Sequence, residues 1–105
     1  MTHNLPPLSV QRSLKKLGRD MEIARRKRRI QCQVLADRAG ISTFTLARIF
    51  AGNPGVSMGR YAAVIFALGF RTPFENLVDA AADEVGLALD EERLPKRIRY
   101  PREDS

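Results

Sequence analysis

The spacing of apolar residues predicts a helix at the start of the chain. Pro6 and Pro7 exclude a helix before Ser9, which is therefore the expected N-cap. From Val10, apolar side chains recur every three or four residues, the period of one helix face. That face consists of Leu14, Leu17, Met21 and Ala24. We expect this helix to run to about Arg28.

Three shorter helices are predicted between residues 32 and 69. The first spans 32–39 and ends at Gly40, where a left-handed residue is expected. The second spans about 43–51 with Ser42 as its cap, and the third begins after the cap Ser57 and stops at Gly69. The inward residues are expected to be Leu35, Ala36, Ala39, Leu46, Ile49, Phe50, Tyr61, Val64, Ile65 and Leu68.

A fifth helix is predicted to start after Thr72 and to reach Asp83. Thr72 as N-cap, Pro73 at the first helical position and Glu75 at the third form a capping box. Its apolar stripe would be Phe74, Leu77, Val78 and Ala81. No segment before the tail alternates with a period of two, so the expected class is all-α, with five helices in a domain of residues 9–84. Residues 1–8 are expected to be flexible, and residues 85–105 to form an extended tail.

Charge adds the first indication of a partner. The chain has 105 residues, which fits one domain, and a net charge of +6. Residues 1–33 carry +7 and residues 34–72 carry +3, whereas residues 73–95 carry −6 and the last ten carry +2. An excess of this kind favours a polyanionic partner, above all nucleic acid. Charged helices also simply keep proteins in solution, so the charge alone does not decide the function.

Several functions and locations are excluded at this stage. No apolar run approaches the ~20 residues of a membrane span, and the N-terminus lacks the pattern of a signal peptide. Cys32 is the single cysteine, so no internal disulfide can form and a reducing cytoplasm is expected. No cluster of Cys and His, nucleophile motif or phosphate-binding loop is present. We therefore expect no enzyme activity, no catalytic residue, no metal and no cofactor.

Residues 30–52 contain two short helices joined by a tight turn, which is the pattern of a DNA-binding helix-turn-helix. They resemble the Cro/CI-like (XRE) family of transcriptional regulators, and the similarity extends over about residues 14–70. The matching residues are Leu35, Ala36, Ala39, Gly40, Ile41, Ser42, Thr45, Leu46, Arg48, Ile49 and Gly52. The resemblance implies a Cro/CI repressor-like fold and repression of transcription by binding a double-stranded DNA operator.

The residues expected to contact bases lie on the second of these two helices. Thr43, Phe44, Ala47 and Arg48 project together, opposite the inward residues Leu46 and Ile49. Arginine can pair bidentately with guanine, and Phe44 and Ala47 can contact thymine methyl groups. In the family, the positions matching Thr43, Phe44 and Arg48 usually contact bases. For Phe44 an alternative is packing against the helix 32–39 or a partner subunit.

A second group of residues is expected to contact DNA phosphates. It consists of Arg25, Lys27, Arg28, Gln31, Gln33, Ser42 and Thr45. Three positions depart from the family. Cys32 stands where a phosphate-binding glutamine is common, which Gln31 or Gln33 can replace. Phe50 replaces a glutamate that pairs with an arginine matching Arg25, so Arg25 is expected to be free for phosphate. Arg29 replaces a glycine and is expected to strain its turn.

Two kinds of protein partner are expected. One recognition helix contacts few bases, so a homodimer is expected, with Phe74, Leu77, Val78 and Ala81 as its interface unless this stripe closes the core. The acidic region of the predicted fifth helix is followed by Leu94, Pro95, Lys96, Arg97, Ile98, Arg99 and Tyr100. This combination resembles antitoxins that bind HipA-type kinase toxins and repress their own operon. The alternatives are a stand-alone phage-type repressor and, from another class, a basic RNA-associated protein.

Overall fold

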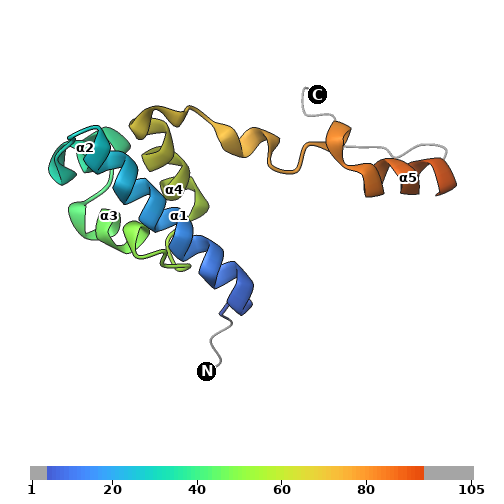
Figure 1. Ribbon diagram of the computed structural model, residues 1–105, viewed down its shortest axis with the longest axis horizontal. Coiled ribbons are helices and arrows are strands. Elements are labelled where there is room, and N and C mark those ends of the chain that lie inside the picture. Colours follow the sequence, from blue (N-terminus) through green and yellow to red (C-terminus); the bar gives the residue numbers. More distant parts are fainter. Residues whose placement is uncertain (1–4, 94–105) are drawn as a thin grey trace, which may run out of the picture. The chain divides into compact units, whose positions relative to one another are not determined.

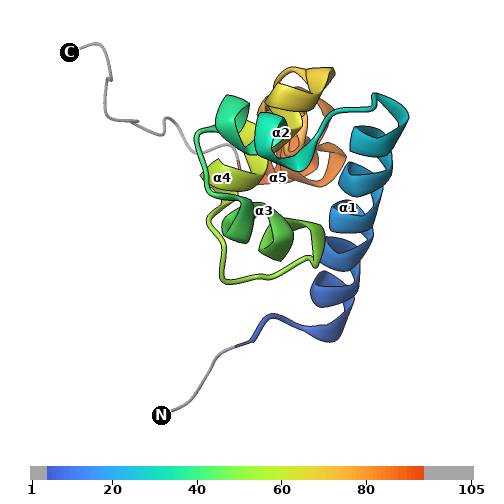
Figure 2. The same ribbon diagram turned by 90° about the vertical axis from the view of Figure 1, so that its left-hand side faces the viewer.

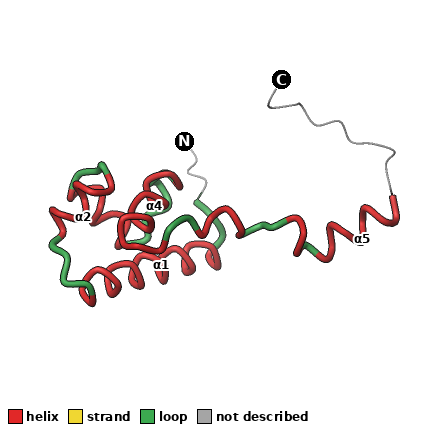
Figure 3. The backbone as a smooth tube through the Cα atoms, turned by 90° about the horizontal axis from the view of Figure 1, so that it is seen from above, coloured by secondary structure: helices red, strands yellow, loops and turns green. Residues whose placement is uncertain are grey.

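The computed structural model describes residues 5–93, and all regular secondary structure in that range is helical (Figure 3). Five α-helices follow one another along the chain (Figure 1): α1 (Leu8–Lys27), α2 (Cys32–Ala39), α3 (Thr43–Phe50), α4 (Met58–Ile65) and α5 (Glu84–Arg93). The predicted all-α class is confirmed for this range. The predictions of a flexible N-terminus and an extended tail lie outside the described residues over 1–4 and 94–105.

The chain divides into two compact units, Met1–Pro73 and Phe74–Ser105. The first contains α1 to α4 and a π-helical turn, η1 (Phe66–Phe70), in which Gly69 has a φ of 104°. The second contains two 3-10 turns, η2 (Pro73–Asn76), which begins on its boundary, and η3 (Ala80–Ala82), followed by α5. None of the helices in the described range combines the length and the hydropathy that a membrane span requires.

Serine caps fix the starts of α3 and α4 as predicted. The Ser42 Oγ accepts a hydrogen bond from the Thr45 N–H at 3.0 Å, and the Ser57 Oγ accepts one from the Arg60 N–H at 3.2 Å. Each bond satisfies a backbone donor that the helix start would leave unpaired. The prediction of Ser9 as the first cap is wrong. Pro7 precedes α1, and its carbonyl accepts hydrogen bonds from the N–H groups of Val10 and Gln11, so the helix begins before Ser9.

Two left-handed residues close the turns on either side of α2. Gly40 ends α2 with a φ of 72°, as expected, and leads directly into the turn before α3. Arg29 lies in the turn between α1 and α2 with a φ of 54°, which a side chain with a Cβ adopts only at a cost. The strain expected from an arginine at this position is therefore confirmed.

The core of the first unit forms where α1, α2, α3, α4 and η1 meet. Figure 2 shows α1 along one side of the group formed by α2, α3 and α4. Helix α1 packs on α3 and η1, and α2 packs on α3, α4 and η1. The buried apolar residues are Met21, Ala24, Leu35, Ala36, Leu46, Ile49, Val56, Tyr61, Val64, Ile65 and Leu68. Of the remaining residues expected inside, Leu14, Leu17, Ala39 and Phe50 are half-buried. The predicted inward faces of α1 to α4 are therefore largely confirmed.

Helix α1 approaches the end of α3 closely at Gly18. A Cβ added to Gly18 would lie 2.5 Å from the carbonyl oxygens of both Ile49 and Phe50. These are backbone atoms, so they cannot move aside by a change of rotamer. The contact therefore requires glycine and fixes the position of α3 on α1.

The predicted helix over residues 73–83 is absent, and the prediction is wrong. The Asp79 Oδ1 accepts a hydrogen bond from the Ala81 N–H at 3.0 Å, and the Asp83 Oδ1 accepts one from the Gly86 N–H at 3.0 Å. These side chains bind nearby backbone groups and begin η3 and α5 instead of continuing one helix. The apolar stripe expected on this helix is also not buried, since Leu77 is 67% and Val78 is 87% exposed. A short helix without burial is marginal in water. Residues 85–93, predicted as extended, belong to α5.

The approach at Gly18 predicts a stability effect. Replacing Gly18 by alanine should lower the free energy of unfolding by about 1–3 kcal/mol, because the new methyl group overpacks the contact between α1 and α3. The matched control is Gly59→Ala in α4, where the nearest atom to an added Cβ is the Ser57 Oγ at 3.9 Å. This control should leave stability unchanged or raise it by up to about 1 kcal/mol. Urea unfolding followed by circular dichroism measures both, and equal stability of the two variants would contradict the contact.

Candidate nucleic-acid interface

The four residues expected to contact bases share one side of α3, which we call the α3 outer face (Thr43, Phe44, Ala47 and Arg48). Thr43, Phe44 and Ala47 are exposed, and the Phe44 ring is the most exposed large apolar side chain of α3 at 70%. On the opposite side, Leu46 and Ile49 are fully buried. The α3 outer face is therefore presented to solvent by a helix whose other side is anchored in the core.

Arg48 is half-buried rather than fully solvent-facing, which corrects the expectation for this residue. Its guanidinium lies over the Phe44 ring at 5.9 Å from the ring centroid. A Cβ on Gly55 would lie 3.5 Å from one Arg48 terminal nitrogen, so the guanidinium also reaches the loop between α3 and α4. Burial raises the pKa of the Tyr61 phenol, and the positive charge of Arg48 opposes this rise. Arg48 is thus held between a ring and a loop.

The loop beside Arg48 is itself fixed by hydrogen bonds. The Tyr61 hydroxyl donates to the Asn53 carbonyl at 2.8 Å, and the Asn53 Oδ1 accepts from the Gly55 N–H at 2.6 Å. The sequence predicts Tyr61 only as an inward residue of its helix and does not indicate this hydrogen bond. The one available signal was a hydroxyl on an otherwise apolar helix face, because a buried tyrosine needs a hydrogen-bond partner.

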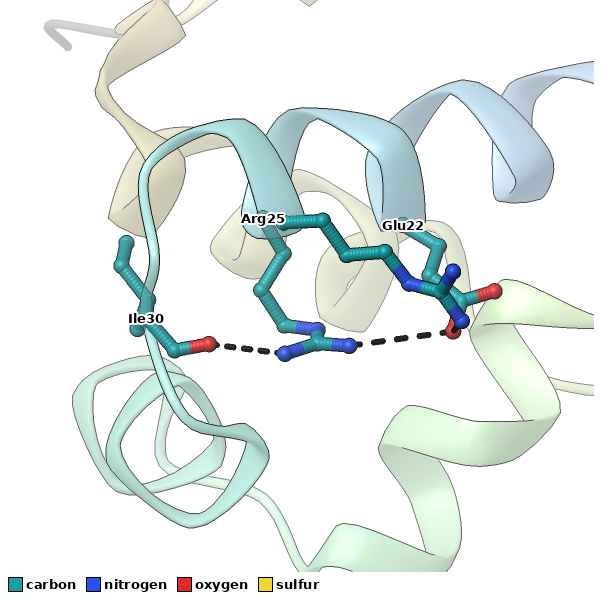
Figure 4. Close-up of polar contacts among 4 residues, drawn as sticks. Glu22, Arg25 and Ile30 are labelled. Atoms are coloured by element: carbon teal, nitrogen blue, oxygen red, sulfur yellow. Dashed lines mark hydrogen bonds and ion pairs between the residues drawn. The ribbon is translucent and has the colours of Figure 1, made fainter.

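The Arg25 guanidinium makes its polar contacts inside the first unit. The expectation that it is free to bind phosphate is therefore not met. Figure 4 shows its guanidinium between the Ile30 carbonyl, to which Nη1 donates at 2.8 Å, and Glu22, whose Oε2 lies 3.8 Å from Nη2. Its side chain is 16% exposed, and its carbon Cζ lies 5.9 Å from the Phe50 ring centroid. Arg25 is therefore held by a backbone carbonyl, a carboxylate and a ring face, all inside the first unit.

Arg28 also has a role within the first unit. Its Nε donates to the Leu68 carbonyl at 2.8 Å and its Nη1 to the Ala24 carbonyl at 3.1 Å. The guanidinium lies 5.0 Å from the centroid of the Phe70 ring. Arg28 thus joins the end of α1 to η1 through two of the five N–H donors of its guanidinium, and the residue itself remains exposed.

The remaining residues expected to contact phosphate are all at the surface except Thr45, which is half-buried. Gln31 precedes α2 and makes no side-chain cap, while Gln33 donates to the Asp37 carboxylate at 2.9 Å. The Ser42 hydroxyl donates to the Thr45 hydroxyl at 3.1 Å. Within residues 5–93 no hydrogen bond or ion pair involves the Lys27 side chain, so its ammonium is available.

The residues expected at a dimer interface do not form one surface stripe. Phe74 is half-buried, and Leu77, Val78 and Ala81 are exposed. Phe74 belongs to η2 and Ala81 to η3, with a turn between them.

Comparison with known proteins adds no family to this geometry. No family model matches the chain, and neither the curated proteins nor the solved structures contain a significant match.

The contacts of Arg25 predict that its loss is structural. Arg25→Ala should lower the free energy of unfolding by about 1–3 kcal/mol, because the Ile30 carbonyl loses its charged donor. Lys27→Ala, two residues away on an exposed site, should change stability by no more than about 0.5 kcal/mol. Thermal unfolding of both variants measures the difference. Equal stability of Arg25→Ala and Lys27→Ala would show that the hydrogen bond from Arg25 to the Ile30 carbonyl does not stabilise the turn between α1 and α2.

Proposed function

We propose that the first unit is a Cro/CI-like helix-turn-helix domain that binds double-stranded DNA and represses transcription, with α3 as the recognition helix. The observation that carries the proposal is the α3 outer face, where an arginine and an aromatic ring lie on an exposed helix whose back is buried. A polyanionic partner is favoured by the charge of residues 1–72, which is +10.

The arrangement of α2 and α3 supports this function. Each helix has eight residues, and only Gly40, Ile41 and Ser42 separate them. The major groove of B-DNA, about 12 Å wide, admits one α-helix. Because Leu46 and Ile49 hold α3 from behind, the α3 outer face can enter a groove without rearrangement of the core.

The side chains of this face suit the edges of base pairs. A guanidinium can donate two hydrogen bonds to O6 and N7 of guanine, and a ring or methyl group can contact the C5-methyl of thymine. The stacking of Arg48 on Phe44 restricts its rotamers before DNA arrives, which lowers the entropy lost on binding.

Phosphate contacts are assigned to the side chains that the fold leaves available. These are Lys27, Arg28, Gln31, Gln33, Ser42 and Thr45. Arg25 is left out because its side chain is 16% exposed and its guanidinium donates to the Ile30 carbonyl. The N-terminal turn of α3 adds favourable backbone dipoles for a phosphate. The antitoxin role remains a prediction from the resemblance.

The proposal is tested by enriching fragments of genomic DNA with the purified full-length protein and sequencing what is retained. A DNA-binding repressor should enrich a short motif, with half-sites related by two-fold symmetry. Equal affinity for random duplex DNA and structured RNA at the same salt, with no motif, would overturn it in favour of an RNA-associated protein.

Arg48 gives the sharpest test of the recognition helix. Arg48→Ala should weaken binding to the enriched motif by roughly 1–3 kcal/mol and relax the preference at one base pair of each half-site. Binding to random DNA should fall much less, and Lys15→Ala on α1, an exposed residue, serves as the control that should change neither affinity. Equal losses for the motif and for random DNA would show that Arg48 holds a phosphate, leaving base contacts to Thr43, Phe44 and Ala47.

Lys27 tests the phosphate contacts separately. Lys27→Gln should weaken binding to all duplexes alike and reduce the slope of log affinity against log salt by about 1 per bound copy, because each copy releases about one counterion fewer. Lys15→Gln removes the same charge in the other half of α1 and should leave the slope nearly unchanged. An unchanged slope in Lys27→Gln would exclude this end of α1 from the interface.

A further inference from the structure

The second unit exposes an acidic segment (residues 74–93) that has no core of its own. None of residues 74–92 is buried, and five large apolar side chains are exposed. They are Leu77, Val78, Val85, Leu87 and Leu89. The segment also contains seven carboxylates and a single basic residue, Arg93. A ten-residue helix such as α5 gains little stability without burial, so this segment needs a surface that covers it.

One face of α5 combines apolar and acidic residues at helical spacing. Glu84, Leu87, Ala88 and Glu91 follow one another at steps of three, one and three, which places them on the same face. Within residues 5–93 neither the Glu84 nor the Glu91 carboxylate makes a hydrogen bond or ion pair. Seven residues of helix separate the two carboxylates by about 10.5 Å along the axis.

The side of α1 that faces away from α3 carries the complementary pattern. Its members, which we call the α1 outer face, alternate at steps of four and three: Arg12, Lys16, Arg19, Ile23 and Arg26. All are exposed, although Ile23 is apolar and 45% of it is accessible. Gly18 and Met21, which are buried on the other side of the helix, show which face is packed inside the first unit. The α1 outer face is therefore open to a partner.

The spacing of the two faces matches. Arg19 and Arg26 are seven residues apart with Ile23 between them, just as Glu84 and Glu91 are seven apart with Leu87 between them. Arg19 has no recorded partner within the described range, and Arg26 has only an exposed ion pair with Glu22 at 3.1 Å. Exposed pairs of this kind contribute little and can be exchanged.

We propose that α5 of one copy docks on the α1 outer face of a second copy, with Leu87 against Ile23 and with Glu84 and Glu91 beside Arg19 and Arg26. The reciprocal contact gives a two-fold symmetric dimer. The choice of a second copy rests on the proposed function, because two half-sites require two recognition helices. The interface thus lies on α5 rather than on the residues Phe74, Leu77, Val78 and Ala81 expected from the sequence.

Charge-swap variants of the full-length chain test this dimer by sedimentation velocity without DNA at low salt. Glu84→Lys with Glu91→Lys should raise the dimer dissociation constant by about tenfold or more, because two attractive pairs at each of the two equivalent contacts become repulsive. Arg19→Glu with Arg26→Glu should do the same. Combining all four substitutions should bring the constant back to within about threefold of the wild-type value, because the pairs are re-formed with reversed sign.

The matched control is Asp90→Lys, which lies off the α5 face, compared with the single substitution Glu91→Lys, which changes the net charge equally. It should shift the dissociation constant by no more than about threefold. Restoration by the fourfold variant excludes simple melting of α5 as the cause of the loss. The proposal is overturned if the wild-type chain is a monomer at all concentrations, if the fourfold variant is not restored, or if the control is as damaging.

Cross-linking distinguishes a second copy from other partners of the segment. In a Cys32→Ser background, a protein with Ile23→Cys is mixed with one carrying Leu87→Cys. Mild oxidation of the mixture should give more disulfide-linked dimer than oxidation of either single-cysteine protein by itself. The proposal is overturned if the mixture gives no more dimer than the separate proteins. Both measurements are made without DNA, so their failure would leave the proposed DNA recognition by α3 untouched.

Discussion

The closeness of α1 to the C-terminal end of α3 is the constraint on which the rest of the first unit depends. Because Gly18 has no side chain, the α1 backbone reaches the carbonyls of Ile49 and Phe50, and α3 cannot rotate about its axis without losing this contact. The rotation of α3 decides which of its residues are buried and which are exposed. Gly18 on α1 therefore helps to determine which side chains α3 exposes to solvent.

The basic residues near the end of α1 have two different roles. Arg25 and Arg28 satisfy the carbonyls of Ile30 and Leu68 and lie over the rings of Phe50 and Phe70. Such contacts use the planar guanidinium, which lysine cannot imitate. Lys27, placed between them, has no such role. The basic run at residues 25–29 looks uniform in sequence, but its members have different roles. Arg25 and Arg28 stabilise the turn before α2 and η1, and only part of the run is a surface for phosphate.

The parts that the sequence predicts well are those governed by local chemistry. The bounds of α2, the serine caps of α3 and α4 and the turn at Gly40 depend on residues close in the chain, and apolar spacing identifies the inward faces of α1 to α4. The exposed position of Thr43, Phe44 and Ala47 follows from the same periodicity.

The sequence predictions that fail have a common physical origin in hydrogen bonds that residue types alone do not reveal. The capping box at Thr72 is a valid local signal, but Asp79 and Asp83 offer competing local hydrogen bonds, and no core is present to favour one long helix. Residue types predict only charge partners for Arg25, whereas its hydrogen bond goes to the backbone carbonyl of Ile30, which no residue type reveals. Likewise, the bond from Tyr61 to Asn53 depends on how α4 packs beside the loop after α3.

The acidic segment raises an electrostatic problem for a protein proposed to bind DNA. Residues 73–95 carry a net charge of −6 and would repel phosphates within a Debye length, about 8–10 Å at physiological salt. If Glu84 and Glu91 pair with Arg19 and Arg26 of a second copy, two of the seven carboxylates are neutralised on the side of α1 that faces away from α3. The repulsion is then reduced by the same contact that brings two recognition helices together. Dimer formation and DNA binding would both weaken as salt rises, so operator occupancy would depend on ionic strength more steeply than phosphate contacts alone dictate.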